Sequence, residues 1–223
     1  MGPDGALGHH GPVPALDLVL GSASPARLAL LRAAGVEPRV VVSDVDEDAI
    51  TEELGTDDPD VLVLALARAK ADAVVARVGG PGARTGTPTL VLGCDSLFTI
   101  DGVTWGKPAD AAEAVARIRS MRGRSGILRT GHHLVDLAGG RCASAVEATT
   151  VRFGSMTDAE VDAYVATGEP LRVAGSFTLD GRSGPFVDGI EGDHTNVVGL
   201  SLPRLRRMLA DLGLSVTDLW STP

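Results

Sequence analysis

The feature that most constrains the fold is a short apolar run followed by a turn and a helix start. Residues Leu16–Leu20 (LDLVL) form a run that stops at a glycine, which is typical of a buried strand. Ser24 suits the N-cap of a helix, and Pro25 suits its first position because the N–H that proline lacks would have no partner there. Gly35 suits the residue just past the helix end. Strand, turn and helix in this order predict an α/β protein.

Further apolar runs and helical patterns alternate along the chain, but two hairpins interrupt them. The dipeptides Asp101-Gly102 and Gly139-Gly140 both predict tight turns between antiparallel strands. We therefore expect an α/β fold with a mixed, partly antiparallel sheet flanked by helices, in two lobes around a cleft. The predicted strands are Leu16–Leu20, Pro38–Val42, Thr89–Cys94, the two hairpin strands 97–100 and 103–105, Arg129–Leu137 and Cys142–Phe153. The predicted helices are Pro25–Ala34, Pro59–Val78, Asp110–Met121, Thr157–Ala166 and Leu202–Leu212, and the predicted loops are 43–58, 79–88 and 174–200.

Composition and charge limit the classes of partner. The formal net charge of −9 argues against a surface that coats DNA or RNA, which needs an excess of Lys and Arg. The two cysteines, Cys94 and Cys142, exclude a disulfide scaffold and fit a reducing compartment. No apolar run approaches the length of a membrane span, and residues 1–15 lack the pattern of a signal peptide. We expect a cytoplasmic protein with a flexible leader over 1–15 and one domain over 16–223.

Several enzyme families are excluded by missing motifs. The sequence has no G-x-x-x-x-G-K-[ST], no G-x-G-x-x-G after the first strand, and no H-E-x-x-H, G-x-S-x-G or C-x-x-C. These absences argue against kinases, Rossmann dehydrogenases, zincins and α/β-hydrolases.

The segment GSASPAR, residues 21–27, is the first candidate for chemistry. Glycine and two serines allow close backbone approach, the helix start offers free N–H groups, and Arg27 adds a cation on the first turn. Ser22 and Arg27 could therefore hold a phosphate without a P-loop. The alternative is an ordinary helix start with a solvated arginine.

Three more candidates follow from charged residues at turns and strand ends. Asp95 ends an apolar strand, where a carboxylate can bind Mg²⁺ or take a proton from water; the alternative is a capping role. Lys107, between glycine and proline, sits in a stiff turn that fixes its ammonium, or is a plain exposed lysine. Glu47 lies in an acidic run that could supply metal ligands or be a solvated surface, and Lys70 alone would be a surface lysine. Cys94 is expected to be a small buried residue.

The histidine pair and the last glycine-rich stretch complete the set. His132 and His133 lie on one predicted strand, so their rings point to opposite faces and cannot chelate one metal together. Asp180 is an acceptor in a stretch that could fold over a ligand or be a structural loop.

Taken in order, these segments resemble the Maf family of nucleotide pyrophosphatases, in the inosine-triphosphatase-like superfamily. The resemblance extends from Leu18 to Leu212. The matching pieces are LVLGSASPAR, VDED (45–48), LARAKA (66–71), GCDS (93–96), GKP (106–108), TGHH (130–133), AGSFTLDG (174–181) and NVVGLSLP (196–203).

The resemblance implies hydrolysis of a nucleoside triphosphate to the monophosphate and pyrophosphate, with Mg²⁺ or Mn²⁺, in a nucleotide-binding cleft. Asp95 matches the family's proton acceptor, and Glu47 matches an acidic residue expected to help hold the metal together with Asp95. The positions that match the polar and basic lining of the phosphate site are Ser22, Arg27, Lys70 and Lys107. A homodimer is an expectation from the family alone.

Three departures from the family pattern bear on the base of the substrate. The usual S-P-R-R is Ser24-Pro25-Ala26-Arg27, the usual Thr after the catalytic Asp is Ser96, and the Gln of the branch that prefers dTTP and UTP is Asp180. The family positions that match Arg27, Ser96 and Asp180 are linked to base choice. An ionised Asp180 only accepts hydrogen bonds, which favours a guanine-type or 7-methylguanine edge over pyrimidine carbonyls. The branch that acts on 7-methyl-GTP has Gln where Ser96 stands, so broad nucleotide use is the alternative.

The alternative to an enzyme is a nucleotide-binding regulator of cell division with weak or no catalysis. The missing arginine at Ala26 supports it. Asp95, Lys70 and Lys107 argue against it, because a pure binder has no need of a base carboxylate facing phosphates.

Overall fold

The computed structural model describes residues 16–79 and 88–220, so the predicted leader over 1–15 and most of the predicted 79–88 loop lie outside the described residues. This part of the chain is an α/β fold around a seven-stranded sheet of order β2-β1-β3-β5-β6-β7, with β4 paired to β3. The strands are β1 (Asp17–Leu20), β2 (Arg39–Val40), β3 (Thr89–Ile100), β4 (Val103–Trp105), β5 (Ser125–Asp136), β6 (Arg141–Phe153) and β7 (Val187–Glu191).

The sheet is mixed, as predicted. Strand β1 runs parallel to β2 and β3, while β3, β5, β6 and β7 pair in antiparallel order and β4 folds back on β3. The predicted turn dipeptide between β3 and β4 has positive φ at both residues, 50° at Asp101 and 77° at Gly102. These are the angles that a two-residue hairpin needs.

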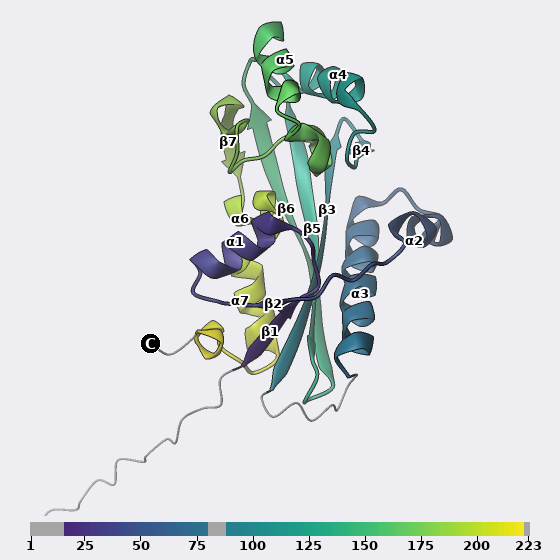
Figure 1. Ribbon diagram of the computed structural model, residues 1–223, viewed down its shortest axis with the longest axis vertical. Helices are drawn as coiled ribbons and strands as arrows, with labels where there is room; N and C mark the ends of the chain where they lie inside the picture. Colours follow the sequence, from purple (N-terminus) through teal and green to yellow (C-terminus); the bar gives the residue numbers. More distant parts are fainter. Residues whose placement is uncertain (1–15, 80–87, 221–223) are drawn as a thin grey trace, which may run out of the picture.

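Helices cover both faces of the sheet (Figure 1). Helix α3 (Pro59–Val78) lies along one face, and α1 (Pro25–Ala33) and α7 (Leu202–Asp211) lie on the other. The other helices are α2 (Glu47–Leu54), α4 (Ala111–Met121), α5 (Asp158–Ala166) and α6 (His194–Val198), with 3-10 turns η1 (Pro170–Arg172), η2 (Ala174–Ser176), η3 (Gly184–Phe186) and η4 (Val216–Leu219). The caps agree with the sequence: Ser24 accepts from the Arg27 N–H, and Thr157 and Glu160 form a capping box. Among the described residues, no helix is both long and apolar enough to cross a membrane.

Separate hydrophobic clusters fill the two ends of the long strands. One cluster packs α1 and α7 on the sheet and includes Cys94. Another gathers around Phe98 with side chains of α4 and α5, at the opposite end of the molecule in Figure 1. Strand β3 passes from the first cluster to the second, so Asp95 and Ser96 lie where the two lobes meet.

Three sequence predictions were wrong. The acidic stretch 43–58 is not all loop, because it contains α2; this helix buries no side chain, so it has no apolar periodicity to detect. The stretch 174–200 contains β7 and α6, which are both only five residues long; β7 has a glycine within it and α6 ends at Gly199. The predicted strand Thr89–Cys94 and the first strand of the predicted hairpin, 97–100, are one continuous strand, β3, so the strand does not end at Cys94.

Candidate active site

An interruption along one edge of β3 creates the candidate site. Strand β1 pairs with β3 up to Leu92, and β4 pairs with it from Phe98 onward. Between these two pairings no described strand covers this edge, and the opening contains Asp95 and Ser96. Ligands of α/β sheets bind where a neighbouring strand ends. Asp95 therefore lies within β3 rather than at its end, and the end of β1 makes the opening.

Asp95 forms a buried ion pair with Lys70, a contact that the sequence did not predict. The Lys70 ammonium lies 2.5 Å from Asp95 Oδ1 and 2.8 Å from Glu47 Oε1. The side chains of Lys70 and Asp95 are each 10% exposed, whereas Glu47, at the first position of α2, is 53% exposed. Lys70 is thus no plain surface lysine: its ammonium joins two carboxylates from separate segments.

Close approach of α3 to the sheet brings Lys70 to Asp95. A Cβ on Gly93 would lie 2.2 Å from the Ala67 carbonyl oxygen, and one on Gly131 would lie 2.1 Å from that of Val63. Gly131 pairs with Asp95 across β3 and β5, so the helix backbone rests on the sheet beside the carboxylate. Any larger residue would hold the helix away.

Burial changes the proton affinity of this carboxyl. Removal from water raises the pKa of Asp95 above its ordinary value, and the nearby charges of Lys70 and Arg27 lower it only in part. Glu47 adds to the rise by repulsion. A raised pKa suits a carboxylate that takes a proton near neutral pH.

Arg27 is held inside the wall of the site by four hydrogen bonds. Its Nε donates to the Gly199 carbonyl at 2.7 Å, one terminal nitrogen donates to Ser22 Oγ at 3.1 Å and the Cys94 carbonyl at 2.8 Å, and the other donates to Ser96 Oγ at 3.0 Å. A guanidinium has five N–H groups, so these contacts use four of them. The Cys94 carbonyl lies beyond the last β3 residue that β1 pairs with, and a longer β1 would have donated to it. Arg27 supplies the hydrogen bond instead.

A chain of hydroxyls leads from Arg27 into the protein. Ser96 Oγ lies 2.9 Å from Thr130 Oγ1, and Thr130 Oγ1 donates to the Asn196 carbonyl at 3.2 Å. Thr130 is fully buried, and it is paired with Ser96 across β3 and β5.

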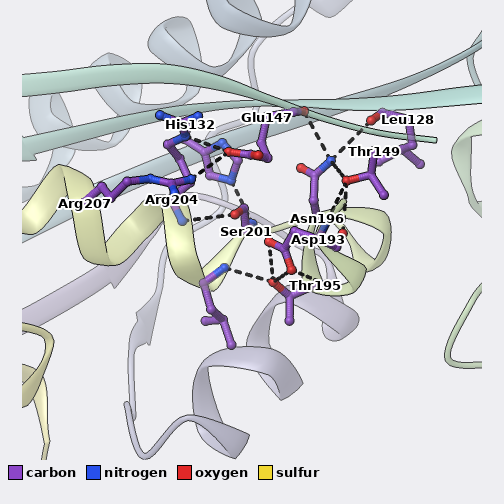
Figure 2. Close-up of polar contacts among 11 residues, drawn as sticks. Leu128, His132, Glu147, Thr149, Asp193, Thr195, Asn196, Ser201, Arg204 and Arg207 are labelled. Carbon is purple, nitrogen blue, oxygen red and sulfur yellow. Dashed lines mark hydrogen bonds and ion pairs between the residues drawn. The ribbon is translucent and has the colours of Figure 1, made fainter. Parts of the chain in front are cut away.

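The corner between α6 and α7 supplies these carbonyl groups, and Figure 2 shows how it is fixed. Asn196 Nδ2 donates to the carbonyls of Leu128 and Glu147 and to Thr149 Oγ1, at 3.1–3.2 Å. His132 Nε2 accepts the Ser201 N–H at 2.9 Å. These bonds tie the corner to β5 and β6.

The two histidines confirm the predicted opposite faces. His132 bonds to Ser201 at the α7 side, whereas His133 Nδ1 lies 2.7 Å from Ser144 Oγ and responds to the charges of Asp72 and Arg68 on α3. Cys94 is fully buried, and burial raises the pKa of its thiol to about 11, which fits the predicted structural role.

Lys107 and Asp180 are both exposed, and no hydrogen bond or ion pair within the described part of the chain joins them to Asp95 or Arg27. Lys107 comes two residues after Trp105, the partner of Phe98, so it lies at the rim of the same opening. The Arg117 side chain holds the preceding carbonyl, that of Gly106, at 2.7 Å. Asp180 lies in a loop closed by Thr178 and Ser183, whose hydroxyl bonds both to the N–H and to the carbonyl of Thr178.

The structure thus brings most of the predicted residues together in two neighbouring networks. Lys70, Glu47 and Asp95 form one part, and Ser22, Arg27 and Ser96 form the other. Sequence reasoning missed the contributions of Thr130, Asn196 and Gly199. The only signal was that the pieces TGHH and NVVGLSLP, which contain them, match the family pattern without an assigned role.

Comparisons with known proteins agree with this arrangement. A family model described as Maf-like protein matches residues 17–212. A protein of Streptomyces coelicolor named nucleoside triphosphate pyrophosphatase is 59% identical over 210 residues, covering 94% of this chain and 97% of that protein. Proteins with the same name from Streptomyces avermitilis and Salinispora tropica are each 56% identical, over 92% of this chain and 94% and 88% of their own lengths.

Proposed function

This chain belongs to the Maf-like protein family, and from that premise we propose that it hydrolyses nucleoside triphosphates to the monophosphate and pyrophosphate. The relatives with this name span nearly the whole chain. The observation that carries the proposal is the buried Asp95 carboxylate, held against the Lys70 ammonium in the β3 opening.

We assign Asp95 the role of general base, because its carboxyl lies at the unpaired stretch of the β3 edge and burial raises its pKa. Its carboxylate takes a proton from water as the water oxygen attacks the α-phosphorus, and the bond from that phosphorus to the oxygen bridging to the β-phosphorus breaks. The products are the monophosphate, pyrophosphate and one proton. The Lys70 ammonium holds the carboxylate in place at 2.5 Å.

Local cations offset the charge of the triphosphate although the whole chain is acidic. Ser22 and the N-terminus of α1 offer hydrogen-bond donors at one side of the opening, and Lys107 stands at the other side. Arg27 contributes its charge from behind Ser22 and Ser96, because most of its hydrogens are already donated.

The residues present fit a divalent cation such as Mg²⁺ or Mn²⁺. Glu47 and Asp95 both contact the Lys70 ammonium, so the two carboxylates lie near each other and each has a second oxygen available to a metal ion. Among the described residues no group of three or more acidic, histidine or cysteine side chains forms a complete cage. Two carboxylates plus substrate phosphates are a common magnesium site. Such an ion, when bound, would neutralise charge on the leaving pyrophosphate.

The proposal also covers the nucleobase of the substrate, the cellular compartment and the partners. Ser96 and Asp180 would contact the base, with a guanine-type edge favoured by the acceptor-only carboxylate of Asp180. We place the reaction in the cytoplasm and expect a homodimer, with no nucleic acid or membrane as partner.

The test is release of pyrophosphate and monophosphate from dTTP, UTP, CTP, GTP and 7-methyl-GTP with Mg²⁺ or Mn²⁺. Asp95→Asn should lower turnover about 10²–10⁴-fold, the usual contribution of a general base, while binding persists. Asp211→Asn, at the exposed end of α7, is the matched control and should retain wild-type turnover. Binding without any cleavage by the wild type would instead favour the regulator, and a clear preference for dTTP and UTP would contradict the role of Asp180.

A further inference from the structure

The hydroxyl chain from Arg27 to Asn196 has only one consistent direction of donation. Arginine N–H groups only donate, so Arg27 gives a hydrogen to Ser96 Oγ, 3.0 Å away. A main-chain carbonyl only accepts, so the 3.2 Å contact of Thr130 with Asn196 uses the single hydroxyl hydrogen of Thr130.

The donor in the contact between Ser96 and Thr130 is then determined. Ser96 and Thr130 lie 2.9 Å apart, and by distance alone either hydroxyl could donate. Because the Thr130 hydrogen goes to Asn196, the Ser96 hydrogen must go to Thr130. The reverse assignment would set two acceptor oxygens against each other at the fully buried Thr130 and lose one hydrogen bond.

The Ser96 hydroxyl, which is partly exposed, can therefore only accept a hydrogen bond from a ligand. A serine hydroxyl has one hydrogen and two lone pairs. The hydrogen is given to Thr130, and one lone pair is taken by Arg27, so a single lone pair is left for the opening in the β3 edge. We propose that Thr130 is a positioning residue that makes Ser96 an obligate hydrogen-bond acceptor, so that the site favours bases carrying an exocyclic amino group. This rests on the proposed function, in which Ser96 contacts the base.

Two substitutions of Thr130 separate the effect of its hydroxyl from the effect of its packing. Thr130→Val keeps the shape but removes the acceptor, which frees the Ser96 hydrogen to point at a substrate carbonyl. Thr130→Ser keeps the hydroxyl and removes only a methyl group. A site built to accept a hydrogen discriminates against an analogue that lacks it.

The readout is the ratio of kcat/KM within two nucleotide pairs, GTP against ITP and CTP against UTP, which differ in one exocyclic amino group. We expect the wild type to favour the amino-bearing member, and Thr130→Val to shift the ratio by about tenfold toward the other member in at least one pair, the size of one hydrogen bond. Thr130→Ser should stay within about twofold of the wild type. In a Ser96→Ala background, Thr130→Val should have no effect on either ratio.

Binding of the same four nucleotides without divalent ions, followed by calorimetry, tests the polarity even if no triphosphate is cleaved, so failure of the proposed function is seen separately. The proposal is overturned by a folded Thr130→Val that leaves both ratios within twofold, or by Thr130→Ser shifting them equally. With dGTP measured as a fifth nucleotide, a shift confined to the ratio of GTP to dGTP would assign the donor to the sugar and overturn the choice of base. If Thr130→Val does not fold, Ser96→Ala decides, since it must abolish the amino preference.

Discussion

Arg27 shows how much of a charged residue's role depends on partners far along the chain. Its position on the first turn of α1 follows from Ser24 and Pro25, which could be identified in the sequence. Its hydrogen-bond partners could not be identified in the sequence, because the Gly199 carbonyl that it contacts is 172 residues away. The residue is only 9% exposed, so leaving its N–H groups without acceptors would be costly. The predicted phosphate contact of Arg27 remains a prediction, while its role in holding Ser22 and Ser96 is visible.

The buried ring of His132 predicts that the protein loses stability in mild acid. Burial first, and then the charge of Arg27, lower the pKa of His132 from 6.5 to about 4. Between these values the unfolded chain binds a proton that the folded chain does not. Stability from the neutral ring is therefore complete above pH 6.5 and is lost as the pH falls toward 4, by up to about 3 kcal/mol. Urea unfolding at a series of pH values measures this loss.

Two substitutions isolate the contribution of His132. His132→Gln can still accept from the Ser201 N–H, and it should flatten the fall in unfolding free energy between pH 6.5 and 4. His194→Gln replaces a side chain that is 72% exposed, and its pH dependence should match the wild type. Equal slopes for His132→Gln and the wild type would show that another group causes the acid sensitivity.

At the scale of elements, the contact between α3 and the sheet positions the ion pair of Lys70 and Asp95. The sequence predicts α3 from its apolar content and β3 from its apolar run, but it does not predict their distance. That distance depends on glycines that face the helix, among them Gly93. In a sequence such glycines look like weak points of a strand, whereas here they mark a close approach of helix and strand backbones.

Gly93→Ala should therefore disrupt both stability and catalysis. The added Cβ would meet the Ala67 carbonyl at 2.2 Å, and neither backbone can yield cheaply. We expect a loss of about 1–3 kcal/mol in unfolding free energy, as for other overpacked sites, together with a fall in kcat as Lys70 moves from Asp95. Gly106→Ala is the stability control because nothing lies within 4 Å of its added Cβ. Denaturant unfolding and steady-state kinetics measure the two effects, and a Gly93→Ala protein as stable as Gly106→Ala would contradict this account.

The elements that the sequence did not predict share a physical property. Helix α2 buries no side chain, and β7 has no fully buried residue, so neither leaves a hydrophobic pattern. Helix α2 is nevertheless stabilised locally, by the Asp46 N-cap and by Gly55 in the left-handed region at its end. Its position matters to the site because it carries Glu47 to Lys70. Surface elements held by caps and by one ion pair are therefore where prediction from apolar patterns fails.

At the scale of the whole molecule, the two lobes have separate hydrophobic clusters but share their longest strands. Strands β3, β5 and β6 pass through both lobes, with continuous pairing from Leu90 to Thr99 along β3. Unfolding one lobe would strip backbone partners from strands that the other lobe needs. The mixed sheet was predictable from the hairpins, whereas the length of the shared strands was not, because Gly93 and Asp95 interrupt the apolar run of β3.

Shared strands predict one cooperative unfolding transition, and the two tryptophans of the chain can test it. Trp105 packs near Phe98 in one lobe, with ring centroids 6.1 Å apart, and Trp220 pairs with Val36 in the other. Trp105→Phe leaves only the second reporter, and Trp220→Phe leaves only the first. Fluorescence of each variant should follow its own far-ultraviolet circular dichroism at the same urea midpoint. A fluorescence midpoint displaced from circular dichroism in either variant would mean that the lobes unfold separately, and that the site between them can open without global unfolding.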